Sequence, residues 1–421
     1  DCGEFIASSY KLQVGHPPGA PLFLMIGRLF SLMAGGDVTM VAYWINMVSV
    51  VSSALTIAFL FWTITILARK IIYKTTKTDK FTPLTQVQQI LVFGSAFVGA
   101  VAYTFTDTFW FSAVEGEVYA TSSLFTAMVF WAMLRWEEVA DEPGADRWIV
   151  LIAYLMGLSI GIHLLNLLTI PALAYIYYFR RYTPTRMGII GTALLGFIII
   201  IFIQYGIIPG FVRGAGQFEM LFVNTIGLPF LSGLAIFSLL ILGYIGYGIY
   251  ASHRGPLHPV FYALSVAVFY YILSASLIFT IVGVGLFGVT YYITKDAFKS
   301  FVYTVTGFVV GILLWEGIYK NKSLDKFVSL GYHTANSTMN LIVVCFGIII
   351  LGYSSYALII IRSNANTPMD ENNPADMFSL LSYLNREQYG SQPLFYGQYY
   401  DAKLDEREPY KDKGPIITRA F

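Results

Sequence analysis

Long runs of apolar residues, separated by short polar segments, dominate this chain. Ten of these runs approach the length of a membrane-spanning helix, and they cover residues 38–67, 88–106, 118–136, 148–163, 167–179, 187–206, 228–251, 259–286, 301–318 and 337–361. A hydrocarbon core of about 30 Å takes about 20 helical residues to cross. The pattern therefore predicts an all-α polytopic membrane protein with about ten spans in this chain.

The composition agrees with a membrane protein. Hydrophobic residues make up 56% of the chain and charged residues 12%, about half the charged fraction of a soluble domain. The net charge of +1 argues against a nucleic-acid partner. The two cysteines, Cys2 and Cys345, give no indication of a disulfide framework.

Lysine and arginine are divided unequally between the polar segments. Alternate segments at 68–87, 135–147, 180–186, 252–258 and 319–333 contain 14 of them, whereas 1–37, 107–117, 164–166, 207–227 and 287–300 contain 5. Cytoplasmic loops carry the excess of positive charge. The first set is therefore predicted to face the cytoplasm, which places residue 1 and the segment after 361 outside.

The run PLFLMIGRLFSLMAGG, which begins at Pro21, is too short for an ordinary span and carries Arg28 in its middle. We interpret it as a helix lying in the outer membrane interface; a short, tilted crossing is the alternative.

The chain is therefore predicted to have three parts. They are an outer loop with interfacial helices at 1–37, a transmembrane bundle at 38–361, and the start of an external soluble segment, rich in Asn and Tyr, at 362–421.

The outer loop opens with two acids. Asp1 and Glu4 are three residues apart and share one face if this segment is helical. A carboxylate at a membrane surface, with its pKa shifted by desolvation or by a nearby cation, can serve as a base toward a hydroxyl group. Acids favoured by the dipole of a helix N-terminus are the simpler explanation. The following His16-Pro17-Pro18-Gly19 is a rigid turn.

This order of features resembles the GT-C glycosyltransferases, and among them the protein O-mannosyltransferases. The similarity is greatest to the bacterial domain-of-unknown-function 2723 family, which includes transmembrane-protein-260-like O-mannosyltransferases. It rests on D-C-G-E-F, G-H-P-P-G-A-P-L and G-R-L-F, and further on S-A-V-E-G-E-V-Y, G-L-S-I-G-I-H-L-L-N, G-Y-S-S-Y-A-L-I-I-I-R-S-N-A-N and L-L-S-Y-L-N-R-E-Q-Y-G.

The resemblance implies a GT-C-like bundle with one more helix upstream of residue 1. It implies transfer of a sugar, mannose, from a polyprenyl-phosphate carrier to Ser or Thr hydroxyls of exported proteins. Asp1 would be the general base of an inverting reaction, and Glu4 would support it or, with Asp1, hold a divalent metal ion. The two acids are adjacent in the mannosyltransferases but are separated here by Cys2 and Gly3. The bacterial inner membrane, with the site on its periplasmic face, is the implied location.

Other polar residues on the predicted outer side are candidates for substrate binding. Glu115 and Glu117 precede an apolar helix, where they either bind acceptor or metal or only stabilise the helix start. His163 and Asn166 lie at the turn of the short hairpin, as carrier-binding groups or as packing residues. His16, in the rigid turn, joins this set.

A phosphate leaving group needs positive charge nearby. Arg28, Arg213 and Arg362 are the arginines on the predicted outer side. Arg213 lies in a glycine-rich segment that would let backbone approach a ligand, or simply in a solvated loop. Arg362 ends a span, where it binds phosphate or extends to the lipid headgroups.

Two other classes of protein are compatible with these features. A transporter predicts ionisable residues near the bilayer midplane, whereas here they concentrate at the outer surface. A membrane scaffold of an envelope complex would need no chemistry at Asp1. The glycosyltransferase hypothesis predicts three kinds of partner: a lipid-linked sugar donor, an exported acceptor protein and membrane lipids.

Overall fold

The computed structural model describes residues 1–79, 82–319 and 335–390. All the regular elements in these ranges are helices. An isolated parallel bridge also joins Val14 to Asp370. The all-α prediction is confirmed. Residues 391–421 of the predicted external segment lie outside the described residues.

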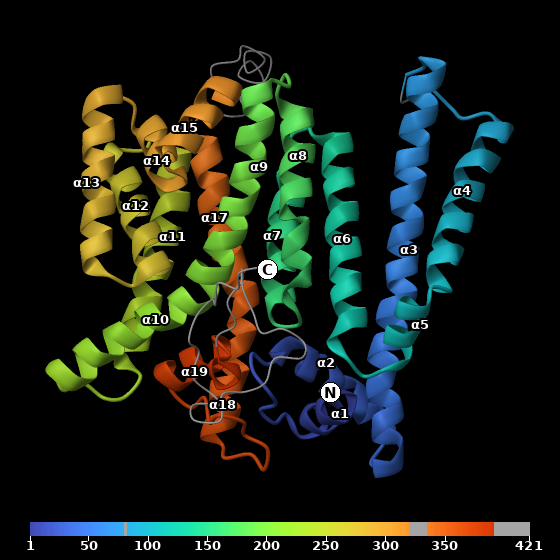
Figure 1. The fold of residues 1–421 in the computed structure, drawn as a ribbon, viewed down its shortest axis with the longest axis horizontal. Coiled ribbons are helices and arrows are strands. Elements are labelled where there is room, and N and C mark those ends of the chain that lie inside the picture. The colour runs from blue at the N-terminus through green and yellow to red at the C-terminus, as the bar shows by residue number, and fades with distance from the viewer. Residues whose placement is uncertain (80–81, 320–334, 391–421) are drawn as a thin grey trace, which may run out of the picture.

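Most helices run along one common direction (Figure 1). The α-helices are α1 Cys2–Lys11, α2 Pro21–Ser31, α3 Val41–Thr76, α4 Gln86–Thr104, α5 Asp107–Val114, α6 Val118–Val139, α7 Arg147–Ile160, α8 Ile170–Arg181, α9 Arg186–Ile201, α10 Ile208–Glu219, α11 Ser232–Arg254, α12 Pro259–Ser274, α13 Leu277–Thr294, α14 Ala297–Thr306, α15 Phe308–Leu314, α17 Ala335–Tyr353, α18 Ala357–Asn364 and α19 Met377–Leu384.

Six helical stretches of the described residues are long and apolar enough to cross a membrane. They are Val38–Thr76, Gln86–Thr104, Arg186–Thr225, Ser232–Arg254, Leu277–Thr294 and Ala335–Asn364, and a seventh is obtained when α5 and α6, which meet at a bend of 115°, are taken as one span. The predicted count of ten is therefore not confirmed. Several of the other runs form shorter apolar helices, among them α7 and α12.

The run 259–286 was predicted as one span, and this is wrong. It forms two antiparallel helices, α12 and α13, joined at Ala275, whose φ of 48° ends α12. The hydroxyl of Ser274 accepts the Ser276 N–H at 3.2 Å, and the Ser276 hydroxyl caps α13. Serine side chains thus satisfy the backbone of the turn without the glycine or proline that usually marks one.

The predicted outer loop 287–300 lies at the opposite end of the bundle. Phe298 packs against Tyr262, in the first turn of α12, with ring centroids 6.2 Å apart. The turn around Lys295 and Lys299 is therefore next to the cation-rich segment 252–258 and was placed on the wrong side. Moving these two lysines changes the division of cations from 14 against 5 to 16 against 3, so the charge asymmetry becomes stronger.

The predicted span 301–318 is also interrupted. α14 ends at Thr306 and α15 begins at Phe308, with Gly307 between them at φ 79°. A Cβ on Gly311 would lie 2.6 Å from the Tyr303 ring, so α15 folds back along α14. The two short helices form a hairpin that enters from the cation-rich end.

Segment 207–227 is helical rather than a loop. α10 continues from α9 through a π-helical stretch at Phe202–Ile207. Its glycines serve helix packing: a Cβ on Gly210 would overlap the Ile272 carbonyl at 1.8 Å, and one on Gly216 would lie 3.4 Å from Phe378 of α19. That they also let a ligand approach stays a prediction.

α7 and α17 also cross with their backbones close together. A Cβ on Gly157 would lie 2.6 Å from the Ile349 carbonyl oxygen, and one on Gly352 would lie 2.5 Å from the Gly157 carbonyl carbon. Small residues permit this approach of two backbones, as they do between membrane helices generally.

α1 and α2 gather with α18 and α19 at one end of the bundle (Figure 1). Val14 N–H donates to the Met369 carbonyl at 3.1 Å, and Glu371 N–H donates to the Val14 carbonyl at 3.1 Å. The predicted outer loop and the beginning of the predicted external segment therefore form one layer at this end.

Cysteine labelling tests the revised orientation of α13. In a background lacking Cys2 and Cys345, a membrane-impermeant maleimide applied to sealed vesicles should label Lys295→Cys and Lys77→Cys from the same face, because both exposed residues lie at the cation-rich end. Lys11→Cys should be labelled from the other face. Labelling of Lys295→Cys together with Lys11→Cys would restore the single-span topology.

Candidate active site

Asp1 stands at the N-terminal end of α1 with 63% of its side chain exposed. Its carboxylate makes no capping hydrogen bond to the helix. The Asp1 backbone nitrogen lies 3.6 Å from the Glu117 carboxylate, whose side chain is 10% exposed. The accessible residue Asp1 thus has the buried Glu117 carboxylate close to its backbone.

Glu4 is held by His16. Its Oε1 accepts the His16 backbone N–H at 2.7 Å, and its two oxygens lie 2.9 and 3.0 Å from His16 Nδ1. Nδ1 carries the proton in this arrangement, because a carboxylate can only accept. The His16 ring packs edge-on against Phe5 at 5.6 Å. Glu4 is therefore fixed, and Asp1 is the accessible acid of the predicted pair.

The chain returns to Glu4 through a tight turn. α1 ends at Leu12 in the left-handed conformation, and Gly19 has a φ of 75°. A Cβ on Gly15 would lie 2.4 Å from Glu4 Oε1. The absence of a side chain at Gly15 is what lets the carboxylate approach the His16 backbone.

Glu117 reaches the site through the bend between α5 and α6. Glu117 N–H donates to the Glu115 carbonyl at 2.8 Å, and Ser49 donates to the Glu117 carbonyl at 3.3 Å. A Cβ on Gly116 would lie 2.7 Å from Asn46 Oδ1 of α3. The bend therefore packs against α3 and directs Glu117 toward Asp1. Glu115 is half-buried, and the contacts that place Glu117 do not extend to its carboxylate.

Two of the predicted phosphate-binding arginines contact the end of α1 instead. Arg28 donates to the Tyr10 carbonyl at 2.7 Å, and Arg362 donates to the carbonyls of Leu12 at 2.6 Å and Lys11 at 3.2 Å. The last carbonyls of a helix have no partner within it. A cation at this end also interacts favourably with the negative end of the helix dipole. The two guanidinium groups thus stabilise α1. Their role toward a phosphate stays a prediction.

His163, Asn166 and Arg213 are positioned by other contacts. His163 caps the short 3-10 helix Leu164–Thr169 by accepting the Leu165 N–H at 3.2 Å, and its ring lies 5.4 Å from Tyr119 at the start of α6. Asn166 is fully buried and donates to the Ser159 hydroxyl at 3.2 Å. Arg213 is on α10, apart from the Asp1 group.

The ligand atoms of Asp1, Glu4 and His16 lie within 4.8 Å of one another. Two carboxylates and an imidazole are a donor set that divalent ions accept. The prediction named Asp1 and Glu4 as metal ligands, and the structure adds His16. Glu4 and His16 already satisfy each other, so a bound ion would replace their hydrogen bonds.

Sequence reasoning did not assign Tyr383 and Tyr356. The Tyr383 hydroxyl donates to the Gly15 carbonyl at 2.7 Å, and the Tyr356 hydroxyl donates to the Gly19 carbonyl at 3.3 Å. Both lie in stretches that carried the family resemblance, L-L-S-Y-L-N and G-Y-S-S-Y-A. That resemblance was the available signal, but it gave the tyrosines no role.

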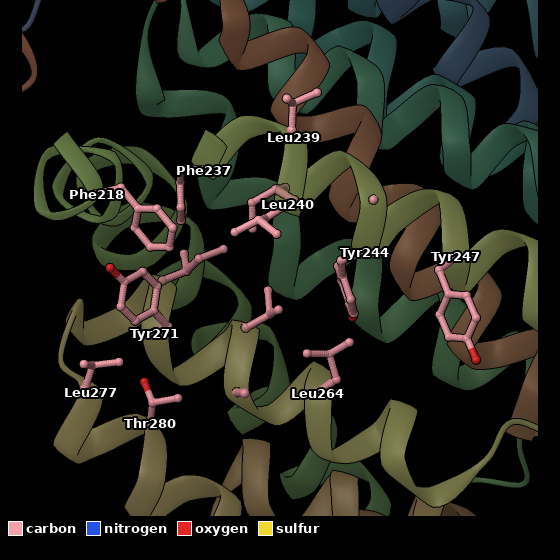
Figure 2. Close-up of a pocket in the computed structure, with 15 residues that line it drawn as sticks. Phe218, Phe237, Leu239, Leu240, Tyr244, Tyr247, Leu264, Tyr271, Leu277 and Thr280 are labelled. Atoms are coloured by element: carbon pink, nitrogen blue, oxygen red, sulfur yellow. The ribbon is translucent and has the colours of Figure 1, made fainter. Parts of the chain in front are cut away.

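An apolar cavity of about 540 Å³ lies away from this site, among α10, α11, α12 and α13. Phe218, Phe237 and Tyr271 converge at one end of it, and Tyr247 lies at the other (Figure 2). No charged side chain lines it among the described residues. Its apolar surface suits a hydrocarbon chain.

Residues 1–186 match the family described as the Protein O-mannosyl-transferase TMEM260 N-terminal domain. This part of the chain is therefore similar to that domain family. It contains the Asp1, Glu4, His16 and Glu117 group, and the predicted transmembrane-protein-260-like resemblance is confirmed.

Two curated relatives show the extent of the similarity. The Protein O-mannosyl-transferase tmem260 of Dictyostelium discoideum is 24% identical over 171 residues, which are 39% of this chain and 18% of the relative. The Protein O-mannosyl-transferase TMEM260 of Mus musculus is 24% identical over 161 residues, 38% of this chain and 19% of the relative. This chain thus aligns with less than a fifth of each relative's length. No solved structure matches it.

The close approach of Gly15 to Glu4 can be tested by adding a methyl group at position 15. Gly15→Ala should lower the free energy of unfolding by about 1–3 kcal/mol, because the methyl group overlaps Glu4. Gly3→Ala is the matched control. Nothing lies within 4 Å of its Cβ position, and alanine favours the helix by about 0.5–1 kcal/mol. Equal thermal unfolding of the two variants in detergent would contradict the tight fit at Gly15.

Arg362→Lys tests the role of Arg362 in holding α1. Lysine keeps the charge but cannot donate in the same forked geometry, so a loss of about 1–2 kcal/mol of stability is expected. Arg213→Lys is the control, because Arg213 has no hydrogen-bond or ion-pair partner in the described part of the chain. Unchanged thermal unfolding of both variants would favour a purely ligand-binding role for Arg362.

Proposed function

We propose that the chain is a glycosyltransferase that moves mannose from a polyprenyl-phosphate carrier to Ser or Thr hydroxyls of exported proteins. The observation that carries the proposal is the exposed Asp1 carboxylate, which stands beside Glu4, His16 and Glu117 within residues that match an O-mannosyltransferase domain family. The names of the two curated relatives support the class of reaction.

Asp1 is the general base in this mechanism. Its carboxylate takes the proton of the acceptor hydroxyl while the hydroxyl oxygen attacks the anomeric carbon of the sugar. The bond between that carbon and the phosphate oxygen breaks, and the electron pair leaves with the polyprenyl phosphate. One displacement inverts the anomeric configuration. The proton then passes from Asp1 to solvent, for which its exposure is suited.

Glu4 and Glu117 act through their placement. Glu4 accepts hydrogen bonds from two groups of His16, so its oxygens are occupied and it supports the turn. Glu117 is buried next to the Asp1 backbone, close to the start of α1. A divalent ion at Asp1, Glu4 and His16, where bound, would supply positive charge toward the leaving phosphate.

The surroundings suit a donor delivered by the membrane. Six or seven helices of the described residues can cross a bilayer, and the apolar cavity among α10–α13 gives further room for a hydrocarbon chain (Figure 2). Cations concentrate at the end opposite Asp1, which supports a site on the outer face. In a bacterial inner membrane this is the periplasmic face.

Sugar transfer from a synthetic polyprenyl-phosphate mannose to a Ser/Thr peptide library tests the proposal. Asp1→Asn should lower the transfer rate by about 10²- to 10⁴-fold, because a carboxamide cannot take the proton. Asp37→Asn is the control: Asp37 is another exposed acid, and its carboxylate bonds only within its own turn, to Thr39.

Equal transfer by the wild type and Asp1→Asn would remove Asp1 from the mechanism. Absence of transfer from every donor by a folded wild-type chain would instead favour the transporter or the scaffold.

A further inference from the structure

Residues 353–384 surround the turn that carries His16, although they lie outside the matched domain. Tyr356, Arg362, Met369 and Tyr383 each contact a backbone group between Lys11 and Gly19. Of these contacts, the one made by Tyr383 reaches the peptide unit that binds Glu4.

Tyr383 is fully buried on α19. Its hydroxyl lies 2.7 Å from the Gly15 carbonyl oxygen and 3.3 Å from the His16 carbonyl oxygen. A Cβ on Gly19 would lie 2.7 Å from the same hydroxyl. The turn is thus closed around the phenol group, and glycine at position 19 provides both the positive φ and the space.

The Gly15 carbonyl and the His16 N–H belong to the same peptide group. They point in opposite directions, because the peptide is planar and trans. Tyr383 binds one side at 2.7 Å, and Glu4 Oε1 binds the other at 2.7 Å. A continuous row of hydrogen bonds therefore runs from Tyr383 through the peptide to Glu4. Each bond in such a row polarises the next.

We propose that Tyr383 is a positioning residue for the Glu4–His16 pair, acting through the Gly15–His16 peptide. Its part in sugar transfer rests on the proposed function, whereas its hold on the peptide does not. By fixing the plane of that peptide, Tyr383 fixes the direction of the His16 N–H, and with it the Glu4 carboxylate one helical turn from Asp1.

The chemistry of the phenol group suits this task. Burial raises the pKa of Tyr383 well above its ordinary value, and the nearby Tyr356, Glu371 and Glu4 raise it further. The hydroxyl therefore keeps its proton, and it remains a donor to the peptide carbonyl at every pH at which the protein is handled.

The amide signal of His16 reports this hold directly. The chain has five histidines, so the protein labelled with ¹⁵N-histidine gives few amide signals, and His16→Gln identifies the one from His16. Tyr383→Phe should move that signal upfield, because the hydrogen bond to the carboxylate weakens, and should leave the other histidine amides in place.

Tyr356→Phe is the matched control. It removes another buried hydroxyl that binds this turn, at Gly19, but leaves the Gly15–His16 peptide bonded to Tyr383. The His16 amide should keep its wild-type position in this variant. An unchanged His16 amide in Tyr383→Phe would overturn the inference, as would equal movement of all the histidine amides, which indicates a general loss of packing.

Kinetics then connect the geometry to the reaction. Tyr383→Phe should lower kcat for sugar transfer by about ten- to a hundredfold with little change in KM for the acceptor, because a displaced Glu4 disturbs the site without removing a binding contact. An altered amide with unchanged kcat would overturn the positioning role. An altered amide in a chain whose wild type transfers no sugar would refute the proposed function and leave the hold on the peptide established.

Discussion

The pairing of Glu4 with His16 determines how the outer layer of the molecule is arranged. For the pair to form, the chain must reverse direction within a few residues after α1, and it does so with a left-handed residue at Leu12 and glycines at 15 and 19. The reversal brings α2 back against α1, where Phe5 and Phe23 pack with ring centroids 5.4 Å apart. One hydrogen-bonded contact thus requires a turn, and the turn fixes the position of two helices.

The same end of the bundle shows how helix ends are satisfied where few solvent-exposed loops are available. The α1 carbonyls accept from Arg28 and Arg362, and the Glu219 carboxylate accepts the Leu234 N–H at 3.1 Å near the start of α11. Backbone groups left without partners at a membrane surface carry a large desolvation cost. Charged side chains near the site therefore have structural duties that must be separated from any chemical ones.

The sequence was sufficient to predict the long membrane-spanning helices. α3, α4 and α17 are uninterrupted apolar helices and overlap most of their predicted ranges, and the spacing of the first acids is compatible with α1, which begins directly after Asp1. It was insufficient where polar side chains replace the usual turn signals, as Ser274 and Ser276 do between α12 and α13. The packing role of glycines in α10 was not recognised, because a glycine needed for helix packing and one needed for ligand approach look the same in a sequence.

The contacts around the site were the least predictable part. Glu4 and His16 are 12 positions apart, and Tyr383 is 368 positions from Gly15. No periodicity links such residues, since their proximity arises only after the whole bundle has assembled. The acids themselves could be named from the sequence, but not the groups that orient them.

The backbone contact between Gly157 and Gly352 has a mechanical consequence for the site. α7 leads to the Gly161 carbonyl, which accepts the Leu22 N–H of α2 at 2.8 Å, and α17 leads to Tyr356 and Arg362. Both supports of the turn that carries His16 therefore start from one close backbone contact, in the last turns of α7 and α17. A disturbance at that crossing would be transmitted to both supports at once, so the site's tolerance to change is set partly by two glycines that never touch it.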